Sequence, residues 1–184
     1  MTARSAFGAV CAFALAVAGP WSAALAQGEG QWTSAAAPNG RFTVETPCVA
    51  AEIAAMRGRP NVVPNVDLAP EARVVCSTGG LIFVAGEINV DGLPAGSSLF
   101  DMLVRQVNTD PTLEGRPAQT TVNGRRAFFN REERRGVVAQ TGFVEVDRAK
   151  VILLVAGARD GSLGVEVQRL AIDRFFNSVR FGGR

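Results

Sequence analysis

Residues 119–129, QTTVNGRRAFF, decide the fold of this chain. Two runs with strand-like composition, Gln119–Val122 and Arg125–Phe129, flank the dipeptide Asn123-Gly124. Asn-Gly is the pair that best tolerates positive φ at both central positions of a type I′ turn, and that turn matches the twist of antiparallel strands. The segment therefore predicts a β-hairpin with a two-residue turn.

The residues after this hairpin predict two more antiparallel strands. Residues 131–136 form a polar turn that leads into a strand at Val137–Val146, and residues 147–150 form the next turn. Val151–Val155 is a continuous apolar run, which is typical of a central strand buried on both faces. Consecutive strands joined by short turns predict an antiparallel meander.

The rest of the chain adds strands and two amphipathic helices. Further strands are predicted at Arg41–Thr46, Arg73–Ser77, Leu81–Val90 and Ser178–Phe181. Residues 48–71 contain three prolines and predict an irregular excursion that starts with a short helix at Ala50–Arg57. A helix after Ser97 or Ser98 has Leu99, Leu103 and Val107 on one face, and Ser98 with Asp101 resembles a capping box. A second helix covers Gly164–Asn177.

These elements predict an α+β fold. An antiparallel meandering sheet is flanked by two amphipathic helices, each of which needs a sheet face to cover, so the layers form an α/β/α-type sandwich. The predicted organisation is a signal peptide at 1–26, a flexible N-terminal segment at 27–40 anchored by Trp32, one α+β domain at 41–181, and a tail at 182–184.

The first 26 residues have the features of a secretory leader. Arg4 gives a positive start, the apolar run of residues 6–18 is too short to span a bilayer, and Ala24-Leu25-Ala26 offers small residues for cleavage before Gln27. We therefore expect an exported protein, periplasmic or extracellular, with no transmembrane anchor after cleavage.

The mature chain then contains two cysteines, Cys48 and Cys76. An isolated pair in an exported protein predicts a disulfide. The alternative is a redox or metal-binding pair, but the Cys-x-x-Cys spacing and other thiol or imidazole ligands are absent. The disulfide would pin both ends of the irregular excursion.

Composition excludes several function classes. The chain has no His and no Tyr, which rules out catalytic triads with a His base and His-ligated zinc or haem. A formal net charge of only +2 gives no basic footprint for nucleic acid. Because no P-loop, nucleophile elbow or dinucleotide fingerprint is present, we expect no cofactor and no metal.

The order of elements resembles that of the PsbP-like family, which includes an extrinsic subunit of photosystem II and the Mog-type Ran-binding import factor. The likeness rests on Trp32 followed by the Phe42–Pro47 motif FTVETP, on the meander between 120 and 155, and on the ending FFNSVRF at Phe175–Phe181. It implies the sandwich fold and the role of a non-catalytic accessory or assembly subunit, as in small exported bacterial relatives. It transfers no functional residue, because the subunit's metal contacts involve His and the import factor uses an acidic surface.

One cluster of side chains is a candidate binding patch. It consists of five arginines in and after the hairpin: Arg125, Arg126, Arg131, Arg134 and Arg135. Guanidinium groups bind carboxylate and phosphate with two hydrogen bonds, so an acidic partner is the functional interpretation. The alternative is a solvated surface neutralised by neighbouring glutamates, and strand alternation places Arg126 on the face opposite to Arg125 and Arg131.

The sequence thus predicts an exported, non-enzymatic accessory, binding or assembly module of the bacterial envelope, whose partner is an envelope protein or another acidic molecule. Two alternatives stay open. One is a small-ligand-binding or carboxylate-based hydrolytic protein with a cleft in which two carboxylates meet an Arg. The other is an inhibitor of a secreted enzyme that presents residues 48–76 or 123–136.

Overall fold

The computed structural model describes residues 31–59, 63, 66–109 and 116–182; the predicted leader lies outside them. The described residues form an α+β fold in which strands predominate. In chain order, the elements are β1 (Thr33–Ala36), β2 (Phe42–Thr46), α1 (Ala50–Met56), β3 (Arg73–Thr78), β4 (Leu81–Asn89), α2 (Leu99–Thr109), β5 (Arg116–Val122), β6 (Arg125–Arg134), β7 (Val137–Asp147), β8 (Lys150–Ala158), α3 (Val165–Asn177) and β9 (Arg180–Phe181).

The meander is confirmed and forms most of the larger sheet. Its six strands lie in the order β3-β4-β8-β7-β6-β5, and every neighbouring pair is antiparallel. Asn123 and Gly124 have φ of 50° and 76°, as the type I′ turn requires. The apolar strand β8 lies between β4 and β7, and its residues Val151–Ala156 are buried.

The predicted polar turn at residues 131–136 is wrong in its length. Strand β6 continues to Arg134, and only Arg135 and Gly136 form the turn, with φ of 50° and 80°. The polar residues stay in the strand because α3 carries partners for them: Arg131 pairs with Asp173, and Glu133 pairs with Arg169. The polar sequence predicts a loop, but these residues belong to a strand whose charged side chains pair with charged side chains of α3.

A second sheet of three strands corrects the expectation of a single one. It has the order β1-β2-β9, so the segment 27–40, expected to be flexible, contributes strand β1, which pairs with β2. Gly182, assigned to the tail, donates its N–H to the carbonyl of Arg41 and prolongs the pairing of β9 with β2. Residues 183 and 184 lie outside the described part.

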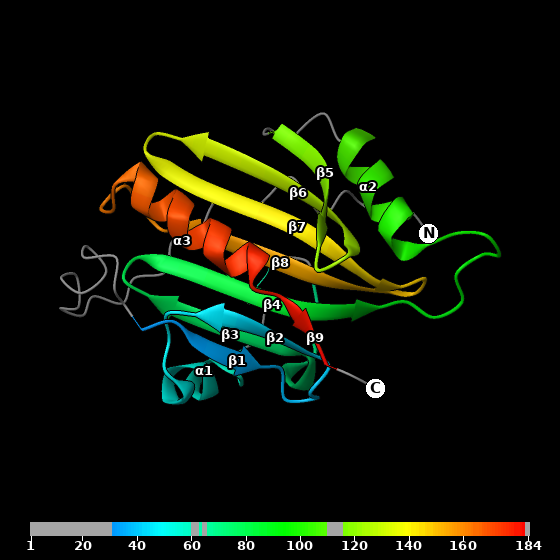
Figure 1. Cartoon of the computed structure of the whole chain (residues 1–184), viewed down its shortest axis with the longest axis horizontal. Helices are drawn as coiled ribbons and strands as arrows, with labels where there is room; N and C mark the ends of the chain where they lie inside the picture. Colours follow the sequence, from blue (N-terminus) through cyan, green and yellow to red (C-terminus); the bar gives the residue numbers. More distant parts are fainter. Residues whose placement is uncertain (1–30, 60–62, 64–65, 110–115, 183–184) are drawn as a thin grey trace.

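The two faces of the six-stranded sheet have separate apolar cores, and the helices flank them as predicted (Figure 1). One face is covered by α3, which packs on β7 and β8 and also contacts β2 of the three-stranded sheet. Phe83, Phe175 and Phe176 lie in this core, with ring centroids 5.2–5.6 Å apart. The opposite face packs against α2 through side chains that include Phe100 and Val104.

The disulfide between Cys48 and Cys76 is present and joins the start of α1 to β3, with both residues fully buried. The excursion it closes is held from inside by Arg73. The buried guanidinium of Arg73 donates to the carbonyls of Leu68, Arg57 and Arg59 at 2.9, 2.7 and 2.6 Å. Within the described ranges, no helix has the length and apolar character needed to cross a membrane.

Candidate functional site

The five arginines of the candidate patch do not lie together, because strand β6 sends them to opposite faces. Arg126 contacts α2, where its guanidinium lies 4.8 Å from the ring centre of Phe100. Arg125 lies on the face of α3, with its guanidinium 4.4 Å from the ring centre of Phe181 in β9. The predicted alternation is therefore correct, and it divides the patch.

The other three arginines lie towards the far end of β6. Arg131 donates to the side chain of Gln140 at 2.6 Å and pairs with Asp173 of α3. Arg134 ends the strand and Arg135 occupies the turn, and both side chains are exposed. This end of β6 is therefore a separate surface from the end that carries Arg125 and Arg126.

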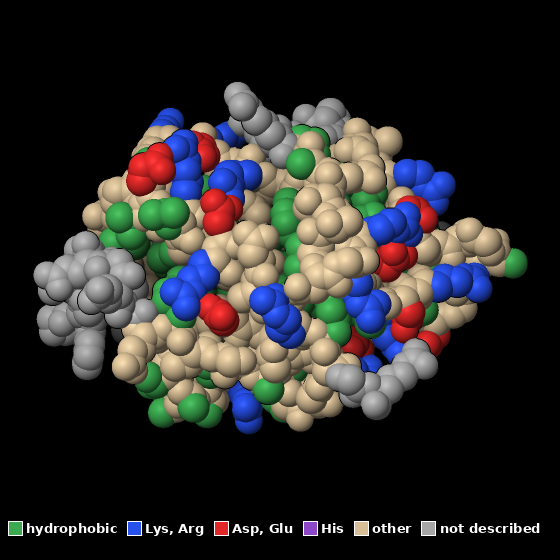
Figure 2. Space-filling model, in the orientation of Figure 1, with side chains coloured by type: hydrophobic (Ala, Val, Ile, Leu, Met, Phe, Trp, Pro, Cys, Tyr) green, Lys and Arg blue, Asp and Glu red, His purple; other side chains and the backbone are tan. Residues whose placement is uncertain are grey.

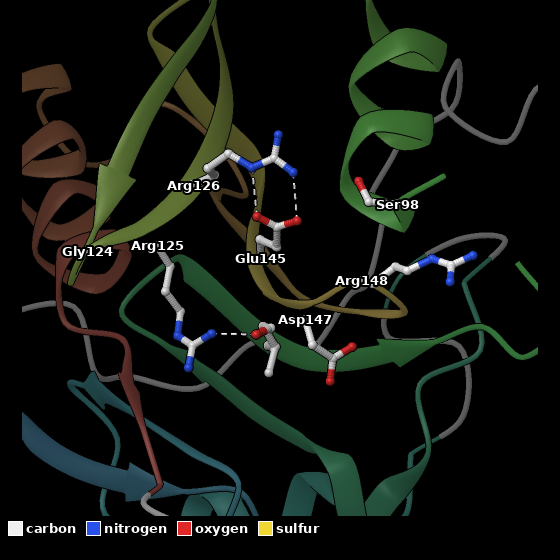
Figure 3. A pocket seen from close by; sticks show the side chains of 8 residues that line it. Ser98, Gly124, Arg125, Arg126, Glu145, Asp147 and Arg148 are labelled. Atoms are coloured by element: carbon white, nitrogen blue, oxygen red, sulfur yellow. Dashed lines mark hydrogen bonds and ion pairs between the residues drawn. The ribbon is translucent and has the colours of Figure 1, made fainter. Parts of the chain in front are cut away.

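Arg125 and Arg126 instead line a hollow together with Arg148, a residue outside the predicted patch. The hollow has a volume of about 390 Å³ and opens between the β5–β6 turn, the end of β7, the β7–β8 turn and the start of α2. Figure 3 shows the side chains that line it: Ser98, Gly124, Arg125, Arg126, Glu145, Val146, Asp147 and Arg148.

Arg126 is fully engaged by carboxylates. Its Nε and Nη2 donate to the two oxygens of Glu145, both at 2.7 Å, and its Nη1 donates to Asp101 at 2.9 Å. These bonds, with Glu145 first, raise the pKa of Arg126. The pKa of Asp101 is lowered, first by the hydrogen bond from the Ser98 hydroxyl and then by Arg126. Arg126 therefore joins β6, β7 and α2, and the two carboxylates that it binds neutralise its charge, so it is a poor partner for an anionic ligand.

Arg125 and Arg148 have a different environment. Arg125 donates to the carbonyl of Val146, and Arg148 donates to three carbonyls of the loop before α2, those of Leu93, Pro94 and Ser97. Among the residues that the structure describes, neither guanidinium pairs with a carboxylate. A carbonyl orients a guanidinium without cancelling its charge, so Arg125 and Arg148 both keep their positive charge at the hollow.

The two carboxylates in the hollow do not form a facing pair. Figure 3 shows Glu145 directed towards Arg126, while the side chain of Asp147 points away from it. Asp147 accepts the backbone N–H of Ala149 at 2.8 Å and lies 3.5 Å from Lys150 Nζ. Within the described ranges, no group of three or more Cys, Asp or Glu side chains could hold a metal ion.

The start of α2 supports the hollow. Ser98 is the N-cap: its hydroxyl accepts the backbone N–H of Asp101 at 3.1 Å and donates to the Asp101 carboxylate at 2.6 Å. The next residue, Leu99, donates its N–H to the carbonyl of Arg148 at 2.8 Å, which ties the helix to the β7–β8 turn. The Ser98–Asp101 pairing predicted from sequence is thus confirmed. It differs from a standard capping box in one bond, because the Asp101 carboxylate accepts from the Ser98 hydroxyl and not from the Ser98 backbone N–H.

Two polar residues that sequence reasoning missed organise the surrounding fold. Arg148 carried no signal, because a charged residue in the turn DRAK is expected to be solvated. Gln168 lies on the buried face of α3, and a lone polar residue among apolar helix positions was the available signal.

No protein-family model matches the chain, and no curated protein matches it either.

Proposed function

We propose that this protein is an exported binding module without chemistry of its own, and that it holds an acidic group of a partner protein in the hollow between the β5–β6 turn and the β7–β8 turn. The observation that carries the proposal is the environment of Arg125 and Arg148. Their hydrogen-bond partners in the described structure are neutral carbonyls, so both cations can pair with an anion.

The chemistry of the hollow favours a carboxylate of a macromolecule. Arginine binds planar anions through two parallel N–H groups, and the single hydrogen bond of Arg125 leaves other N–H groups for this purpose. The hollow is open and about 390 Å³ in volume, which suits a side chain or chain terminus presented by a partner. An electrostatic contact of this kind mainly sets the rate and specificity of association.

Two features of the chain support an accessory role. The leader and the disulfide are typical of a protein that works outside the cytosol. The resemblance to the PsbP-like family adds an analogy at the level of the fold, which by itself identifies no partner.

The proposal is tested by capture from an envelope fraction of the source organism. The mature protein is the bait, and Arg125→Gln with Arg148→Gln forms the test variant. Arg159→Gln is the matched control, because Arg159, like Arg148, is exposed and donates to a neutral group, the hydroxyl of Ser77, near the opposite end of β8.

We expect a partner that the wild-type protein and the Arg159 variant retain and that the double variant loses, with binding that weakens as salt increases. Capture that is equal for all three proteins would place the partner on another surface. Failure to capture any partner, together with turnover of a small substrate by the wild-type protein, would favour the hydrolytic alternative.

A further inference from the structure

Strand β5 forms an open edge of the six-stranded sheet. It pairs with β6 on one side and is the last strand in the sheet order. The side chains of Pro117, Ala118, Gln119, Thr120 and Thr121 are all exposed, so residues on both faces of the strand are in contact with solvent. None of the residues 117–124 is charged.

The turn geometry determines which backbone groups point away from the protein. In a hairpin with a two-residue turn, the residues that flank the turn form a hydrogen-bonded pair, and such pairs alternate along the strands. Val122 flanks the turn opposite Arg125, so Val122, Thr120 and Ala118 bond to β6. Gln119 and Thr121 therefore direct both their N–H and C=O groups outward, and Pro117 adds an outward carbonyl.

Among the described residues, this edge has little of the usual protection against strand pairing. Protective features are charged side chains, prolines, bulges and covering segments, and of these β5 has only Arg116 and Pro117 at its start. The β5–β6 register runs without a shift from Arg116 to Val122, so no bulge turns the edge away. At the other edge of the sheet, Val75 and Cys76 of β3 are buried and the strand contacts α1. Figure 2 shows the surface over β5 as uncharged, with blue and red side chains on either side of it.

We infer that β5 pairs antiparallel with β5 of a second copy of this chain, which joins the two six-stranded sheets across a two-fold axis. The inference is independent of the function proposed for the hollow. Two properties of the strand select a second copy as the occupant. Residues 117–122 carry no charge, so two identical strands paired around Gln119 or Thr120 meet there without like-charge repulsion. The outward N–H and C=O groups of Gln119 and Thr121 can also bond to the same groups of a second copy of β5 that runs in the opposite direction.

The pairing makes a specific geometric prediction. A two-fold arrangement that uses the outward groups of Gln119 and Thr121 centres on Gln119 or on Thr120. In either register the two copies of Gln119 lie directly opposite or diagonally opposite each other, within about 8 Å. Leu170 on α3 is also highly exposed, at 69%, but lies away from this edge and serves as a control position.

The test combines crosslinking with the oligomeric state. Gln119→Cys and Leu170→Cys are each prepared with Cys11→Ser, so that the introduced thiol is the one that reacts; Cys48 and Cys76 form the buried disulfide. A short bismaleimide is the crosslinker, and sedimentation velocity up to millimolar protein measures association. Gln119→Pro removes one outward N–H, which an edge strand tolerates, and Gln119→Ala keeps it.

We expect covalent dimers for Gln119→Cys and none for Leu170→Cys. Wild type and Gln119→Ala should dimerise reversibly, while Gln119→Pro stays monomeric with an unchanged circular dichroism spectrum. A wild-type protein that is monomeric up to millimolar concentration would overturn the inference. Dimers that Gln119→Pro leaves intact, or equal crosslinking at position 170, would also overturn it, since association would then use another surface.

Discussion

Gln168 offers a sharp test of how α3 is fixed to the sheet. Its side chain is fully buried and makes three hydrogen bonds: Oε1 accepts the N–H of Val138 at 2.7 Å, and Nε2 donates to the carbonyls of Gly136 and Leu163 at 2.8 and 2.6 Å. The last β7–β8 pair is Ala139 with Gly157, so Val138 lies one residue beyond the paired part of the two strands. Gln168 thus replaces the missing strand partner of Val138.

The substitution Gln168→Met keeps the volume of the side chain and removes all three hydrogen bonds. Each bond contributes about 0.5–1.5 kcal/mol net, and a buried N–H left without a partner costs about 1–3 kcal/mol. We therefore expect the free energy of unfolding to fall by about 3 kcal/mol. For a domain of this size the m-value in urea is about 2 kcal/mol/M, so the urea concentration at the midpoint of unfolding should fall by about 1.5 M.

Urea unfolding followed by circular dichroism measures this change. Gln106→Met is the matched control, because Gln106 is an exposed glutamine on α2, and its change should stay within about 0.5 kcal/mol. Amide exchange at Val138 should also become faster in the Gln168 variant. A loss below about 1 kcal/mol for Gln168→Met, with slow exchange at Val138, would refute the role assigned to this residue.

The disulfide, the Asp101 carboxylate and Gly142 each offer a further test of how the fold is held together. Replacing Cys48 and Cys76 together by Ala opens a loop whose ends are 28 residues apart. The free energy of unfolding measured by urea titration should then fall by about 3–4 kcal/mol. A loss below about 1 kcal/mol would contradict the loop-closure argument. Because the pKa of Asp101 is lowered in the folded state, its contribution to stability is present above about pH 4 and is lost as the pH falls further. In thermal melts, Asp101→Asn should therefore reduce the fall of the melting temperature below about pH 4. An unchanged pH dependence would contradict this role of Asp101. In Gly142→Ala the new Cβ would lie 2.3 Å from Phe129 Cδ1, so we expect a loss of about 1–3 kcal/mol by calorimetry, and a neutral effect would show that this side chain can move.

The parts of the fold that sequence predicted are those with a local cause. The β5–β6 turn follows from Asn123-Gly124, the central strand from the apolar run at 151–155, and the helices from their apolar faces. The disulfide follows from an isolated pair of cysteines in a chain whose sequence predicts an export leader. Each of these signals is contained within a few neighbouring residues or one residue type.

The parts that sequence missed depend on partners far apart in the chain. Strand β1, with the sequence TSAA, has no strand-like periodicity and forms because β2 offers a free edge. The extent of β6 depends on Asp173 and Arg169 of α3. The hollow is lined by both Arg125 and Arg148, and the pairing of β6 with β7 brings these distant parts of the chain to the same end of the sheet.

The proposed function depends on the positive charges of Arg125 and Arg148, which are expected to receive an acidic group in the hollow. The most direct measurement is an NMR titration of the isotope-labelled protein, prepared without its predicted leader, with hexaglutamate, followed through backbone amides and arginine Nε–H signals. We expect shifts concentrated at Gly124, Arg125 and Arg148, which high salt and the double Arg→Gln variant abolish. Shifts centred on the exposed end of β6 at Arg134 and Arg135, or no shifts at all, would contradict it.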